Sequence, residues 1–186
     1  MRISNLHRAL SQTERNPFNH LGPENKGRSQ THVGVHFVRE EGVDKTGGGV
    51  GKEQIPEYIQ DLLAGLQDFD RSVRFDAVWA LGDMGEKARA AVPSLIYILK
   101  NDPDEKVRCT AVLVLCNIGG EQAVSAVIST LKDTNADVRF EAAWALGIME
   151  KEASAAVEAL TIVASKDSVA VVRVAAQDAL EAIQDS

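Results

Sequence analysis

One pattern recurs four times along the chain and constrains its fold more than any other feature. Each copy begins with an aspartate, and the leading residues Asp68, Asp102, Asp133 and Asp167 are 34, 31 and 34 residues apart. A Val-Arg pair follows each of them at the same spacing, at Val73-Arg74, Val107-Arg108, Val138-Arg139 and Val172-Arg173. A repeat of this length is typical of solenoids, in which each unit buries its apolar face against its neighbours. The sequence therefore predicts a stack of similar units.

Capping signals and helical periodicity predict that each unit is a pair of α-helices. Asp102 is suited to the N-cap position, Pro103 to the first helical turn and Glu105 to a capping box. Gly119 can adopt the left-handed conformation that ends a helix. Second helices, with apolar residues at helical spacing, are predicted over 90–100, 121–132 and 153–164. No apolar run approaches the length of about 20 residues that a membrane span needs, so the expected fold is an all-α solenoid.

The repeats occupy only the second part of the chain. Residues 1–54 hold all four histidines, many Gly, Asn and Ser residues and few apolar clusters, so we expect a flexible, mostly disordered tail there. The repeat domain is predicted over 55–186, with about eight helices. Its expected parts are a cap helix at 55–67, repeats at 68–101, 102–132 and 133–166, and a terminal half repeat at 167–186. The last helix is the most polar, as the end of a stack requires.

Three short patterns in residues 1–54 do not meet the requirements of the sites or signals that they suggest. The stretch TGGGVGKE at 46–53 lacks the first glycine and the final Ser or Thr of a phosphate loop, which favours a glycine linker over nucleotide binding. His32 and His36 would share a metal only on a helix, and the Val-Gly-Val stretch between them disfavours one. Met1 to Leu10 lacks the apolar core of a secretory signal.

The two parts of the chain differ in charge. Residues 55–186 contain 12 Lys and Arg against 21 Asp and Glu, a balance of −9, and residues 1–54 contain 8 against 6, a balance of +2; the sum is the overall −7. An acidic solenoid is a poor partner for phosphate backbones, so we expect no binding to nucleic acid. We expect each arginine of the Val-Arg pairs to bind an acidic residue of a neighbouring unit, such as Asp102, Asp133 or Asp167, instead of forming a basic surface.

Two motifs within the repeats carry a resemblance to a known family. They are the D-x-x-x-x-V-R opening and the A-x-x-A-L-G run, which occurs at 77–82 and 142–147. On these residues the chain resembles HEAT repeats, and most closely the short HEAT-like repeats of the phycobilisome lyase type. The resemblance covers about residues 55 to 186. It implies an armadillo-type α-solenoid in which one helix of each pair lines a concave surface that binds a partner.

In each first helix some positions are not required to be apolar for stacking. These positions lie four residues apart and therefore share one face of the helix. A solvated face would carry Lys, Glu and Gln, whereas this one carries Phe and Trp twice, flanked by acidic residues. Contiguous exposed aromatic residues usually mark a binding surface. The alternative is that the Phe-Trp pairs belong to the core or lie under the chain's own tail. The predicted partner-binding residues are Phe75, Asp76, Trp79, Asp83, Cys109, Leu113, Asn117, Phe140, Glu141, Trp144 and Ile148.

The repeat region lacks the residues of simple catalytic sites. It contains no histidine and no arrangement of a nucleophile with a base. Cys109 and Cys116 are seven residues apart, which is about 10 Å along a helix axis, too far for a disulfide. With no further cysteine a zinc site is not expected either. We therefore predict no catalytic residue, metal or cofactor, and two unpaired cysteines suit a reducing cytoplasm.

Two functions remain open. The first is a non-enzymatic scaffold or adaptor, cytoplasmic and monomeric, that binds a protein partner on the concave surface and contacts no membrane. The second is implied by the resemblance: a phycobilin lyase subunit, or a phycobilisome-associated factor, that holds a tetrapyrrole chromophore. In that case the aromatic residues could stack on the chromophore, and Asp76, Asp83 or Glu141 could pair with its pyrrole nitrogens.

Overall fold

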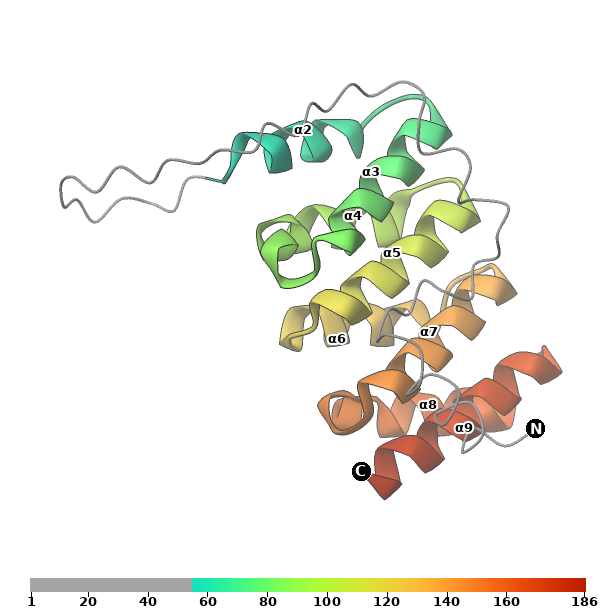
Figure 1. Ribbon diagram of the computed structural model, residues 1–186. Helices are drawn as coiled ribbons and strands as arrows, with labels where there is room; N and C mark the ends of the chain where they lie inside the picture. Colours follow the sequence, from blue (N-terminus) through green and yellow to red (C-terminus); the bar gives the residue numbers. More distant parts are fainter. Residues whose placement is uncertain (1–54) are drawn as a thin grey trace, which may run out of the picture.

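The computed structural model describes residues 55–186, whose helices stack along one direction (Figure 1). The predicted tail, with its histidine pair and glycine-rich stretch, lies outside these residues. The α-helices are α2 (Glu57–Gly65), α3 (Arg71–Asp83), α4 (Val92–Asn101), α5 (Glu105–Ile118), α6 (Glu121–Thr130), α7 (Ala136–Met149), α8 (Val157–Lys166) and α9 (Ala170–Asp185). Two 3-10 helices are η3 (Gly85–Ala91) and η4 (Glu150–Ala156). The described residues contain no strand, so the predicted all-α solenoid is confirmed.

The helices interlock between units. The first helices form one layer, in which α3 contacts α5, α5 contacts α7 and α7 contacts α9. Each second helix packs on the first helix of the following unit, in the pairs α4 with α5, α6 with α7 and α8 with α9 (Figure 1). The helix α2 packs on α3 in the same way. The core between the layers is aliphatic, with Leu81, Leu95, Leu115, Leu146 and Leu160 fully buried.

The first helices begin later than the sequence predicts. Their N-caps are Asp70, Asp104 and Asn135, whose side chains accept backbone N–H groups of the first turn. The prediction of Asp102 as N-cap is therefore wrong, and Pro103 lies in the loop before α5. Asp102 is buried two residues upstream of the cap, where its Oδ1 accepts the N–H of Asp104 at 2.9 Å. Asp102 also binds Arg74 of the preceding unit, and this ion pair explains why an aspartate recurs at this position of the repeat.

The connection between the two helices of a unit has two forms. In the first and third units the chain turns through η3 and η4, so α4 and α8 begin at Val92 and Val157, later than predicted. In the second unit α5 ends at Gly119, as predicted, and α6 begins two residues later. Gly119 and Gly120 both have positive φ, at 71° and 91°. The missing 3-10 turn accounts for the shorter spacing, 31 residues instead of 34.

The last helix differs from the others on the side that faces away from the stack. Gly147 of α7 packs so closely on α9 that a Cβ atom there would lie 3.1 Å from the Cα of Ala179. The equivalent position of α9 is Glu181, and Gln177 stands where α7 has the buried Ala143. Both side chains are exposed, and no further helix could approach α9 as closely as α9 approaches α7. The predicted polar end of the stack is thus present in α9.

None of the helices described here is both long and apolar enough to cross a membrane.

Candidate functional site: an aromatic face held by an arginine–aspartate ladder

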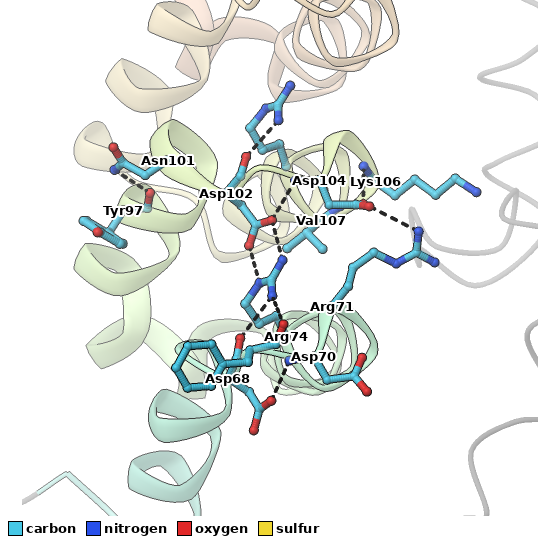
Figure 2. A network of polar contacts seen from close by, with 12 residues as sticks. Asp68, Asp70, Arg71, Arg74, Tyr97, Asn101, Asp102, Asp104, Lys106 and Val107 are labelled. Atoms are coloured by element: carbon cyan, nitrogen blue, oxygen red, sulfur yellow. Dashed lines mark hydrogen bonds and ion pairs between the residues drawn. The ribbon is translucent and has the colours of Figure 1, made fainter.

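A ladder of ion pairs fixes each first helix relative to the next. Arg74 of α3 donates from Nε and Nη2 to the two carboxylate oxygens of Asp102, at 2.7 and 3.0 Å (Figure 2). Its Nη1 donates to the carbonyl of Asp68, at the start of its own unit. The same pattern occurs twice more, between Arg108 and Asp133 and between Arg139 and Asp167. Each arginine therefore connects the loop of its own unit to the loop of the following one.

The chemistry of the ladder is structural. The hydrogen bonds that Arg74, Arg108 and Arg139 donate to the carboxylates raise the pKa of these arginines further above its ordinary value, so the guanidinium groups stay charged. The hydrogen bond from Arg139 lowers the pKa of Asp167. Bidentate, charge-assisted pairs of this kind are the strong class of hydrogen bonds. The prediction that the arginines of the Val-Arg pairs bind acidic residues of neighbouring units is confirmed for Arg74, Arg108 and Arg139, which are not available to a partner. Arg173 instead donates to the carbonyl of Asp167 in its own unit.

The predicted binding residues lie on the first helices, and most of them reach the surface. We define the aromatic face as the surface of α3 and α7 that carries Phe75, Trp79, Phe140 and Trp144. Phe140 is 37% exposed, and the other three rings are half-buried. Phe75 and Trp79 stack, with ring centroids 6.3 Å apart and an interplanar angle of 14°. Around them Asp76, Asp83 and Asn117 are exposed, and Cys109, Glu141 and Ile148 are half-buried.

Leu113 does not fit the predicted surface. Its side chain is 1% exposed and belongs to the apolar core, so the expectation that it contacts a partner directly is wrong. The helix α5 is flanked by α3 on one side and by α7 on the other, which leaves its centre covered. The rings of Phe75, Trp79 and Trp144 pack against the same core. The aromatic face thus consists of two Phe-Trp pairs on either side of a closed centre.

Acidic residues surround the aromatic face, and burial changes their titration. Burial raises the pKa of Asp83 and Asp178. It raises the pKa of Glu141 to about 7, with a smaller contribution from the charge of Asp137. The Glu141 carboxyl group therefore titrates near neutral pH.

The two cysteines are poor nucleophiles. Burial is the main reason that the pKa of Cys109 and that of Cys116 are raised to about 12. Both residues are free thiols, as the sequence predicts. Since the thiolate is the reactive form, neither side chain is suited to covalent chemistry at neutral pH. Within residues 55–186 no cluster of His, Cys, Asp and Glu residues could hold a metal ion.

A pocket at the edge of the aromatic face was not predicted from the sequence. It has a volume of about 290 Å³ and lies between η3 and η4, where the second unit lacks its 3-10 turn. Asn117 and Ile148 belong both to its lining and to the predicted binding residues. The lining also includes the carboxylates Glu86 and Glu152. The signal that could have found it is the 31-residue spacing, because a missing turn leaves a gap between its neighbours.

Comparisons with known proteins agree with the repeat architecture. Residues 92–181 match the family model of HEAT repeats, and residues 73–101 match that of the PBS lyase HEAT-like repeat. This chain is a HEAT-type repeat protein of the PBS lyase kind. The two family models together span residues 73–181, which include the helices that carry the ladder and the aromatic face.

Individual relatives of this HEAT-type chain include proteins of different roles. The phycocyanobilin lyase subunit alpha of Nostoc sp. is 32% identical over 105 residues, which are 53% of this chain and 38% of that protein. The chain therefore matches little more than a third of that curated relative. The structure of the complex of CpcE and CpcF of phycocyanin lyase from Nostoc sp. is similar with a TM-score of 0.55 and 27% identity, over 77% of this chain and 58% of that one. A designed armadillo repeat protein in complex with the peptide (KR)4 gives a TM-score of 0.53 and 27% identity, over 67% and 64%.

Proposed function

We propose that the repeat domain is a non-catalytic binding module that holds a protein partner on the aromatic face. The observation that carries this proposal is the placement of two Phe-Trp pairs at the surface of the first and third units, on either side of α5, with Phe140 37% exposed. Large aromatic side chains are over-represented among the residues that dominate binding energy at protein interfaces. The ladder supports the same function, because it holds α3, α5 and α7 in a fixed relation before a partner arrives. A preorganised surface loses less conformational entropy on binding.

The chemistry of the face favours binding over catalysis. The described residues include no histidine, and both thiols have a pKa of about 12. Burial raises the pKa of Glu141 on this face to about 7, and the thiols of Cys109 and Cys116, whose pKa is raised to about 12, stay protonated at that pH. The relatives support a binding function as well, since one solved structure is a complex of two subunits and another holds a peptide.

The proposal is tested by capture of partners with the full chain. A variant with Phe75, Trp79, Phe140 and Trp144 all changed to alanine should lose a partner that the intact chain retains. The loss of even one aromatic anchor can cost about 2–4 kcal/mol of binding free energy. A matched control changes Tyr97 and Ile162 to alanine, because these exposed apolar residues lie on the second helices α4 and α8. Circular dichroism must show unchanged helix content in both variants. Capture of the same partner by the aromatic variant would place the binding surface elsewhere.

A second candidate is a subunit of a bilin lyase. It is favoured by the 32% identity to the phycocyanobilin lyase subunit alpha of Nostoc sp. and by the similarity to the CpcE and CpcF complex. Under this proposal the Phe-Trp pairs would stack on a tetrapyrrole, and a second subunit would complete the enzyme. Addition of a bilin to the purified chain should then change the absorption spectrum of the chromophore and quench the emission of Trp79 and Trp144. A spectrum identical to that of the free bilin would exclude the chromophore-binding version.

A further inference from the structure

The surface around the aromatic face is acidic because basic residues are missing from the whole length of each first helix beyond its Val-Arg pair. The segments 75–84, 109–118, 140–149 and 174–186 contain no Lys, Arg or His. The same segments carry six acidic residues: Asp76, Asp83 and Glu141 are among the predicted binding residues, and Asp178, Glu181 and Asp185 lie on α9. All 12 basic residues of 55–186 therefore lie on the second helices, in the connections or in the first turns.

Four arginines in the first turns of the first helices are already engaged. Arg74, Arg108 and Arg139 bind the carboxylates of the ladder, and Arg71 pairs with Asp104 at 3.1 Å. Asp76 and Asp83 are exposed, and neither forms an ion pair within residues 55–186. Asp76 and Asp83 are therefore not neutralised by ion pairs within residues 55–186.

The backbone adds to the negative potential at one edge of the face. The helices α3, α5 and α7 all end beside the pocket between η3 and η4. A helix C-terminus carries a partial negative charge equivalent to about half an elementary charge. Glu86 and Glu152 line the same pocket. The edge of the face where the helices end is thus more negative than the side-chain charges alone would make it.

We propose that the partner held by the aromatic face is a polypeptide segment rich in lysine and arginine. This inference rests on the proposed function, since it names the chemistry of the partner at the same surface. Two interactions would stabilise Lys and Arg side chains on this face: Coulomb attraction to the acidic residues and cation–π contact with the Trp and Phe rings. Acidic or phosphorylated segments would be repelled by the same carboxylates. The aromatic rings supply contact area, and the acidic residues supply the preference for one sign of charge.

The test measures binding of labelled peptides to the full chain by fluorescence anisotropy, with tryptophan emission as a second signal, since both tryptophans lie on the face. The probe is an eight-residue peptide of alternating Lys and Leu; its controls replace Lys by Gln or by Glu. Only the Lys peptide should bind. Its affinity should fall between 0.1 M and 1 M salt, because the Debye length shortens from about 10 Å to about 3 Å.

The variant Asp76→Asn with Asp83→Asn should bind the Lys peptide about tenfold more weakly. A control with the same change in net charge, Asp61→Asn with Glu158→Gln, lies on α2 and α8 and should bind it as the intact chain does. Equal binding of the Lys and Gln peptides, or equal loss in both charge variants, would overturn the inference. So would self-association of the chain that blocks the probe, since the occupant would then be a second copy.

The two proposals fail differently. A partner that depends on the four aromatic residues but binds the Asp76→Asn, Asp83→Asn variant at full strength would leave the proposed function intact and refute the basic partner. A Lys peptide that binds equally well to the variant with four alanines would show attraction to the acidic domain without use of the face. That result would refute the basic partner at this face, whereas the proposed function is decided by the capture experiment with the same variant.

Discussion

The second repeat unit, 102–132, differs from the units on either side of it in its turn and in its surface. Its helices meet at Gly119 and Gly120, whereas the neighbouring units turn through η3 and η4. Its first helix carries Cys109 and Leu113 where the neighbours carry Phe and Trp. The three units still share the ladder, with the same bonds between arginine and aspartate. The comparison separates what the stack requires of every unit from what it leaves free.

The difference has a consequence for binding. The buried Leu113 closes the centre of the face, so the aromatic pairs of α3 and α7 stand on either side of it. The missing 3-10 turn opens the pocket between η3 and η4 at the edge of the same surface. The short unit therefore shapes the surface, and the longer units supply its aromatic side chains.

The largest effect is expected from breaking the feature that the units share. Arg108→Ala removes the partner of Asp133, and both side chains are only 12% exposed. Removing one member of a buried pair leaves an uncompensated charge and typically costs 3–5 kcal/mol, so the free energy of unfolding should fall by about that amount. Arg74→Ala in the first unit should cost a similar amount, since Asp102 is 1% exposed. Urea unfolding followed by circular dichroism measures both.

The matched control for the ladder is Arg71→Ala. Arg71 also binds an aspartate, Asp104, but its side chain is 55% exposed. Exposed ion pairs contribute about 0–1 kcal/mol, so this variant should unfold close to the intact chain. A loss for Arg108→Ala no larger than that for Arg71→Ala would mean that the ladder does not hold the units together.

These outcomes bear on how much the sequence could predict. The period and the Val-Arg spacing were sufficient for the solenoid and for the pairing of each arginine with the next unit, because both follow from the repeat itself. Asp102 was predicted to be the N-cap of α5, because Asp is favoured at that position. Its actual role is the ion pair with Arg74, which joins residues 28 positions apart and which local sequence signals do not reveal. Leu113 was assigned to the surface from its helical position alone. Its burial depends on how closely α3 and α7 flank α5, which periodicity does not contain.

A second prediction concerns the contact between the second and third units, where Glu141 lies. Burial raises the pKa of Glu141 to about 7 from the ordinary 4.5, so the folded chain binds this proton more tightly than the unfolded chain. Stability from this group is therefore fully present below about pH 4.5 and is lost as the pH rises through 7. Glu141→Gln has no group to ionise at this position, so its stability should not fall as the pH rises. At about pH 8 its free energy of unfolding should exceed that of the intact chain by up to about 3 kcal/mol.

The measurement is urea unfolding between pH 5 and 8, below and above the raised pKa. Among the groups that interact with Glu141 are Asp137 of its own helix and the thiols of Cys109 and Cys116 on α5, and these thiols stay protonated in this range. Glu158→Gln, at an exposed position of α8, is the control and should leave the pH profile unchanged. A Glu141→Gln variant whose stability differs from the intact chain by the same amount at both ends of the range would contradict the raised pKa.

A third prediction transplants the aromatic pair into the second unit. Leu113→Trp places a larger side chain at a position where the leucine is only 1% exposed. Overpacking of this kind should lower the free energy of unfolding by about 2–3 kcal/mol. Cys109→Phe, one turn earlier on the same helix, is half-buried and should be tolerated at a cost below about 1 kcal/mol. Thermal unfolding distinguishes the two. Equal tolerance of both changes would show that the centre of the face is open and that Leu113 is available to a partner.

The smallest effect is expected at the turn that only the second unit contains. Gly120 has φ 91° and ψ 160°, a conformation that is essentially restricted to glycine, and a Cβ atom there would meet nothing within 4 Å. Gly120→Ala should therefore cost only the backbone strain, about 1–2 kcal/mol. Gly120→Asn should not recover it, because asparagine tolerates the left-handed helical region and not this one. Recovery by Asn, measured as a return of the unfolding midpoint, would mean that the turn can relax and that the shorter unit does not depend on its two glycines.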